Sequence, residues 1–73
     1  MTLSRTQRMV LRTLDEAGEP LFNGTLGVRT GLRFNSEVFH SLMKLGLIKN
    51  HPYELTDAGR AAITSGDRGG DNG

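Results

Sequence analysis

The sequence predicts one mainly helical α+β domain with a small β-hairpin near its C-terminal end. Three observations lead to this prediction: apolar residues recur at helical spacing, Gly and Pro separate the helical stretches, and a β-prone segment surrounds Pro52. A chain of 73 residues has room for one small core. We expect the domain to cover 1–65 and the tail 66–73, which has no apolar residue, to be disordered.

The first helix is predicted to begin after Ser4 and to end near Ala17. Ser4 is a good N-cap, and Gln7 can complete a capping box with it. One face of this helix is predicted to be buried: Leu3, Gln7, Val10, Leu11, Leu14 and Ala17. The opposite face carries three arginines: Arg5, Arg8 and Arg12. This row is either a phosphate-contacting strip or a solvated surface, and the solvated surface is the commoner of the two.

A break and a short helix are predicted next. Gly18 can cap the first helix, and Pro20 blocks its continuation. The segment Leu21-Phe22 is predicted to be extended and to pair at a sheet edge. A second helix is predicted over 24–30, and Gly31 ends it. Its candidate core residues are Leu26, Val28 and Leu32.

The central helix is predicted over 35–45. Its buried face is predicted from apolar residues at helical spacing: Val38, Phe39, Leu42 and Leu45. Its other face holds small polar and charged residues: Ser36, Glu37, His40, Ser41 and Lys44. Gly46 ends the helix, because glycine adopts the left-handed conformation of a C-cap without steric cost.

The remaining residues predict a hairpin and a last helix. The hairpin covers 49–55, with its turn at Asn50-His51-Pro52. Thr56 is a good N-cap for a helix over 58–63, and Asp57 suits the helix N-terminus. Two helices joined by a tight turn and followed by a hairpin form the winged helix-turn-helix arrangement.

Three segments resemble, in order, landmarks of winged helix-turn-helix regulators of the PadR and MarR kinds. LSRTQRMVLRTL resembles their opening helix, and TGLRFNSEVFHSLMKLGLI resembles their helix-turn-helix, with Val38-Phe39 as the apolar-aromatic pair of PadR-type proteins. YELTDAGRAAI resembles their strand-to-helix segment, with Leu55, Thr56, Gly59 and Arg60 as its "LT..GR" ending. The resemblance covers roughly 3–63 and implies a bacterial or phage DNA-binding protein. The wing is shorter than in those families, and no residues remain for their dimerising helices, so we expect a monomer or weak oligomer.

The predicted function is sequence-specific binding of duplex DNA in transcription regulation, with the helix 35–45 in the major groove. The candidate DNA-binding residues are Arg29, Arg33, Asn35, Ser36, Glu37, His40, Ser41, Lys44, Lys49, Asn50 and His51. The alternative is a winged-helix protein-interaction module, because the net charge is only +1. A basic strip that joins Arg29, Arg33, Lys44 and Lys49 would favour DNA. An acidic or apolar patch on the same face would favour a protein partner.

Other classes of function are not expected. His40 and His51 lack the carboxylate pair, nucleophile or phosphate-binding glycine loop that enzymes need, so catalysis is not predicted. The chain has no cysteine, and neither a metal nor a cofactor is predicted. It has no signal segment and no apolar run near the roughly 18–20 residues of a membrane span. We therefore expect a cytoplasmic protein without a membrane partner.

Overall fold

The computed structural model describes residues 2–50 and 52–66. Within them the protein is mainly helical and carries a two-stranded antiparallel hairpin, which confirms the predicted α+β class. The elements are α1 (Arg5–Ala17), α2 (Asn23–Thr30), α3 (Ser36–Lys44), β1 (Ile48–Lys49), β2 (Glu54–Leu55), α4 (Asp57–Ala61) and the π-helical turn η1 (Ala62–Gly66). No helix in these residues is long and apolar enough to cross a membrane. His51 and the predicted tail beyond Gly66 lie outside the described residues.

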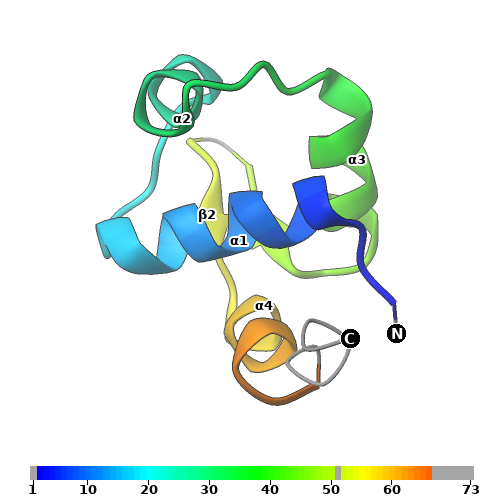
Figure 1. The fold of residues 1–73 in the computed structure, drawn as a ribbon. Coiled ribbons are helices and arrows are strands. Elements are labelled where there is room, and N and C mark those ends of the chain that lie inside the picture. Colours follow the sequence, from blue (N-terminus) through cyan, green and yellow to red (C-terminus); the bar gives the residue numbers. More distant parts are fainter. Residues whose placement is uncertain (1, 51, 67–73) are drawn as a thin grey trace.

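Helix α1 runs through the middle of the fold and contacts α2, α3, β2 and α4 (Figure 1). Its capping box forms as predicted: the Ser4 hydroxyl accepts from the Gln7 backbone N–H at 3.1 Å, and Gln7 Oε1 accepts from the Ser4 N–H at 2.8 Å. Gly18 ends α1 in the left-handed conformation, with φ of 68°. Local capping therefore fixes both ends of the helix on which the other elements pack.

The core lies between α1, α3 and the hairpin. Its buried hydrophobic residues are Leu3, Val10, Leu11, Leu14, Leu21, Leu26, Phe34, Phe39, Leu42, Leu47 and Ile48. Leu3, Val10, Leu11 and Leu14 of the first predicted face are thus confirmed as core, as are Leu26, Phe39 and Leu42. Three other predictions were wrong, because Val28, Leu32 and Leu45 are 84%, 47% and 46% exposed.

These three residues are exposed for different local reasons. Val28 is two residues from the buried Leu26, which places the two on opposite sides of α2. Leu32 follows Gly31, whose positive φ of 71° turns the chain out of the helix. Leu45 is the C-cap of α3 and still donates its N–H to the carbonyl of Ser41 at 3.0 Å, as in a helix. Six residues at about 100° each place it about 120° around the axis from the buried Phe39, at the edge of the inner face. Apolar spacing in such short helices therefore did not decide which side faces the core.

A Schellman motif at Gly46 replaces Leu45 with Leu47 in the core. Gly46 has a φ of 77° and donates its N–H to the carbonyl of Met43 at 3.0 Å. The N–H of Leu47 donates to the carbonyl of Leu42 at 2.9 Å. This turn brings Leu47 back over the end of α3, where it is only 2% exposed. The predicted end of the helix at Gly46 is confirmed. Leu47, and not Leu45 as predicted, is the buried leucine at this end.

The hairpin is short, and the extended residue Leu21 pairs with it beside β2. Ile48 pairs with Leu55, and Lys49 pairs with Glu54. Leu21 then forms a two-way bridge with Tyr53, with N–H to carbonyl distances of 2.9 and 2.8 Å. The predicted pairing of the extended segment is therefore confirmed for Leu21, whereas Phe22 is the N-cap residue of α2 and is 54% exposed.

Candidate nucleic-acid interface

Aromatic rings fix α3 to the segments before and after it. The Phe39 ring stacks on the ring of Tyr53, with centroids 4.2 Å apart and planes 3° from parallel. The Phe34 ring meets the same Phe39 ring edge-on at 6.0 Å. Phe39 and Leu42 are fully buried. The helix is therefore anchored by its inner face, which leaves its outer face available for a partner.

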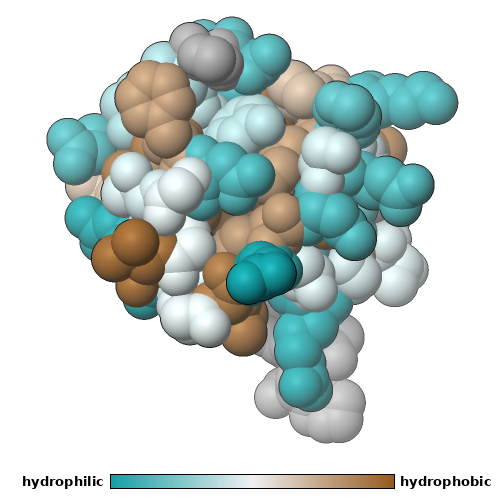
Figure 2. Space-filling model, turned by 90° about the horizontal axis from the view of Figure 1, so that it is seen from above, coloured by the Kyte–Doolittle hydropathy of each residue, from teal (hydrophilic) through white to brown (hydrophobic). Residues whose placement is uncertain are grey.

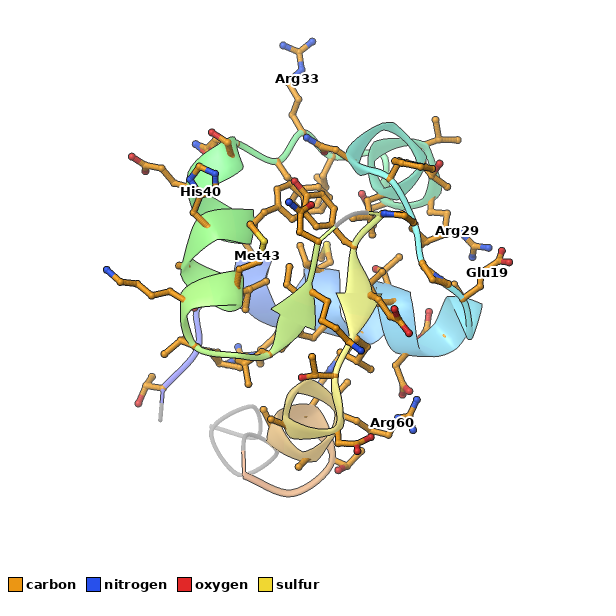
Figure 3. All side chains as sticks on the ribbon, turned by 180° about the vertical axis from the view of Figure 1, so that it is seen from behind. Glu19, Arg29, Arg33, His40, Met43 and Arg60 are labelled. Atoms are coloured by element: carbon orange, nitrogen blue, oxygen red, sulfur yellow. The ribbon has the colours of Figure 1, made fainter. Side chains whose placement is uncertain are left out.

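Polar residues project from the outer face of α3. Ser36, Glu37, His40 and Lys44 are exposed, as predicted. Figure 3 shows His40 pointing away from the body of the domain. Glu37 lies in the first turn and Lys44 in the last, the arrangement that the helix dipole favours. Because 37, 40 and 44 are spaced by three and four residues, these side chains share one strip of the helix.

Ser41 does not belong to this exposed strip, and its predicted place on the outer face was wrong. Its hydroxyl accepts from Nε2 of Gln7 at 2.9 Å and donates to the carbonyl of Val38 at 2.8 Å. Both bonds are partly buried between α1 and α3. Helical spacing placed Ser41 on the polar face, whereas its hydrogen bond with the amide of Gln7 turns it toward α1.

The turn that leads into α3 adds two exposed residues to the outer strip. Arg33 points straight out of the domain beside the first turn of α3 (Figure 3). Asn35 is the N-cap residue of α3, and its side chain makes no capping hydrogen bond. An exposed amide at this place can contact a base edge or a phosphate. Arg33 and Asn35 thus lie next to the end of α3 that carries Glu37, and the strip continues from there to Lys44 in the last turn.

The remaining candidate cations do not extend this surface. Arg29 of α2 lies on the other side of the domain from His40, on the same side as Glu19 (Figure 3). Lys49 on β1 is directly opposite Glu54 on β2, so an anion offsets its charge. The continuous basic strip of Arg29, Arg33, Lys44 and Lys49 is therefore not present. Asn50 is exposed beside Lys49, and His51 lies outside the described residues.

Apolar surface accompanies the polar surface on the side of α2 and α3. Viewed from above these helices, hydrophilic residues border hydrophobic ones, and the most hydrophobic atoms gather at one side (Figure 2). Val28 and Leu32 are the exposed apolar residues that belong to α2 and its C-terminal turn. Within 2–50 and 52–66, no group of three His, Asp or Glu side chains could hold a metal ion.

Sequence reasoning missed two features of this region. The stacking of Phe39 on Tyr53 joins residues from a helix and a hairpin, and aromatic residues at those positions gave only a weak signal. The Gln7–Ser41 bond spans 34 positions of sequence, and Gln7 among apolar residues on the buried face of α1 was its one visible sign. Comparisons with protein-family models, curated proteins and solved structures found no match to this chain.

Proposed function

We propose that this chain is a winged helix-turn-helix domain, similar to PadR and MarR regulators, that binds duplex DNA and regulates transcription in a bacterial or phage cytoplasm. Helix α3 would enter the major groove, and the hairpin would be a short wing. The observation that carries the proposal is the strip of Glu37, His40 and Lys44 on a helix anchored by Phe39 and Leu42. A rigid helix with an outward polar strip is what readout of base edges in the major groove requires.

Each side chain of the strip suits one kind of DNA contact. Lys44 would bind a phosphate or a guanine, and His40 would contact a base edge. Glu37 would accept a hydrogen bond from the amino group of a cytosine. Arg33, which points outward at the start of α3, would bind a backbone phosphate. The readout surface is therefore small, and one domain contacts only a few base pairs.

Charge sets the expected strength of binding. Of the candidate cations, Arg33 and Lys44 belong to the α3 surface, and Glu54 offsets the charge of Lys49. About two phosphate contacts give a log–log salt slope of roughly −2. We therefore expect weak, salt-sensitive binding by a single chain.

A titration of the purified chain with random and genomic duplex fragments, read by gel shift, tests the proposal. Lys44→Ala should weaken binding and reduce the magnitude of the salt slope by about one unit if Lys44 binds a phosphate. Arg29→Ala is the matched control, because it removes the same charge from the other side of the domain. Equal losses in the two variants, or no binding by the parent chain, would remove α3 as the recognition helix.

The second candidate function is a winged-helix protein-interaction module, favoured by one observation. Val28 is 84% exposed in the middle of a helix, and Leu32 beside it is 47% exposed. Apolar side chains at this exposure suit a protein partner better than a phosphate backbone. In that case the chain would not bind duplexes, and Val28→Asp would disrupt a protein complex that Lys44→Ala leaves intact.

A further inference from the structure

We infer that Gln7 and Ser41 form a positioning link, which fixes the rotation of α3 about its own axis and thereby sets which DNA sequences the domain prefers. The inference rests on the proposed function and adds a specificity-determining pair that need not touch the DNA. It concerns the contact between α1 and the recognition helix. The side chains of Glu37, His40 and Lys44 would contact the bases, and the link would set the orientation of these side chains toward the DNA.

The link is a directed chain of hydrogen bonds. The Ser4 N–H donates to Gln7 Oε1 at 2.8 Å, which orients the Gln7 amide. Gln7 Nε2 then donates to the Ser41 hydroxyl at 2.9 Å, and that hydroxyl donates to the Val38 carbonyl at 2.8 Å. Because the Ser4 bond requires the oxygen of the Gln7 amide, the nitrogen must face α3. The N-cap of α1 is thus connected to the middle of α3.

This chain adds a directional constraint to the apolar anchors of α3. Phe39 and Leu42 hold the helix against the core through apolar contacts, which have no donor–acceptor direction. A hydrogen bond instead weakens steeply outside a donor–acceptor distance of about 2.7–3.2 Å. Ser41 is the neighbour of His40 and lies one turn from Glu37 and Lys44. The link therefore acts at the helical turn that carries the reading side chains.

Rotation affects base contacts and phosphate contacts differently. A rotation of roughly 20° moves a side-chain tip about 5 Å from the axis by roughly 2 Å. Such a shift breaks a hydrogen bond to a base edge. A flexible lysine can follow a phosphate over the same distance, since its attraction is electrostatic and weakly directional. Loss of the link should therefore reduce sequence discrimination while non-specific affinity and the salt slope stay the same.

The first test measures the free protein and needs no DNA. Residual dipolar couplings of backbone N–H groups report the orientation of α3 relative to α1. Ser41→Ala removes the acceptor from the link, and the couplings of α3 should change while those of α1 stay fixed. Ser41→Thr keeps a hydroxyl at the same place and should preserve the couplings of the parent. An α3 orientation in Ser41→Ala identical to that of the parent would overturn the inference.

The second test measures discrimination. A duplex selected from a random library by the parent chain is compared with a scrambled duplex of equal length. Ser41→Ala should reduce the affinity ratio about fivefold to tenfold, as expected for hydrogen bonds lost at base edges, with the scrambled duplex bound within about twofold of the parent. Gln7→Leu combined with Ser41→Ala should lower the ratio no further than Ser41→Ala alone, because both residues act through one link.

The outcomes separate the inference from the proposed function. Equal losses on both duplexes in Ser41→Ala would indicate general destabilisation and would overturn the positioning role, as would an unchanged ratio. Restoration of the ratio in Ser41→Thr supports it. A parent chain that binds no duplex would refute the proposed function instead, and the dipolar couplings would still decide whether the link orients α3.

Discussion

Gly59 of α4 lies against the backbone carbonyl of Leu47, so close that a β-carbon at position 59 would overlap with that oxygen. The same carbonyl accepts a hydrogen bond from the Thr56 N–H at 3.1 Å. The Thr56 hydroxyl donates to the carbonyl of Gly46 at 2.7 Å and accepts from the Gly59 N–H at 3.0 Å. The first turn of α4 is therefore joined, backbone to backbone, to the turn that ends α3.

Gly59→Ala should destabilise the protein, because the new methyl group has no space beside Leu47. Separating α4 from that turn should cost about 1–3 kcal/mol of unfolding free energy, the usual cost of overpacking. Urea denaturation followed by circular dichroism measures it. Gly24→Ala in α2 is the control, since a β-carbon there meets nothing within 4 Å. That variant should match the parent or gain up to about 1 kcal/mol, and equal stability of both variants would refute the close contact.

Two leucines three positions apart at the end of α3 should respond very differently to truncation. Leu42 is fully buried, so Leu42→Ala should lower the unfolding free energy by about 2–5 kcal/mol. Leu45 is 46% exposed at the C-cap, and Leu45→Ala should cost less than about 1 kcal/mol. Thermal melts of both variants provide the measurement. A larger loss in Leu45→Ala would mean that the Schellman turn does not bury Leu47 in its place.

The stacked rings of Phe39 and Tyr53 should matter more than the Tyr53 hydroxyl. Tyr53→Phe keeps the stacked ring and should leave the melting temperature close to that of the parent. Tyr53→Leu keeps an apolar side chain but loses the stacking, which should cost about 0.5–1.5 kcal/mol. A melt of Tyr53→Leu that coincides with that of Tyr53→Phe would show that the ring pair contributes nothing beyond apolar burial.

Local features of the fold could be predicted from the sequence because neighbouring residues determine them. The capping box at Ser4, the left-handed Gly18 and the N-cap at Thr56 depend on residues within one turn. The hairpin and the paired Leu21 followed from β-prone residues between turn signals. The last helix was predicted as one element over 58–63, whereas it begins at Asp57 and widens at Ala62 into η1. Helix propensities do not distinguish an α-helical turn from a π-helical turn, so the change at Ala62 could not be predicted.

Features that depend on tertiary contacts could not be predicted in the same way. The exposure of Val28 depends on which side of α2 faces α1, and a single buried residue, Leu26, gives too little periodicity to decide this. The direction of Ser41 depends on Gln7 in another helix. The pairing of Lys49 with Glu54 depends on the hairpin register. The exposure of Ser36, Glu37, His40 and Lys44 on α3 was therefore predicted correctly, whereas the distribution of charge around α3 was not.

The last prediction concerns the anion opposite Lys49. If the hairpin is a wing that approaches the DNA backbone, Glu54 weakens binding by offsetting Lys49 across the two strands. Glu54→Gln should then raise the affinity for any duplex and increase the magnitude of the salt slope by up to about one unit, since Lys49 becomes available to a phosphate.

Glu16→Gln is the matched control, because it makes the same change in net charge at an exposed position of α1. Gel shifts at several salt concentrations compare the two variants with the parent, and melting curves check that both are folded. The carboxylate of Glu54 lies directly opposite Lys49 in the hairpin, so its replacement should have a larger effect than that of Glu16, which lies on α1. Salt screens the field between exposed charges over about 10 Å at 0.1 M. Equal gains in both variants would indicate a general charge effect and would exclude the hairpin as a DNA-contacting wing, while α3 alone would remain the proposed reading element.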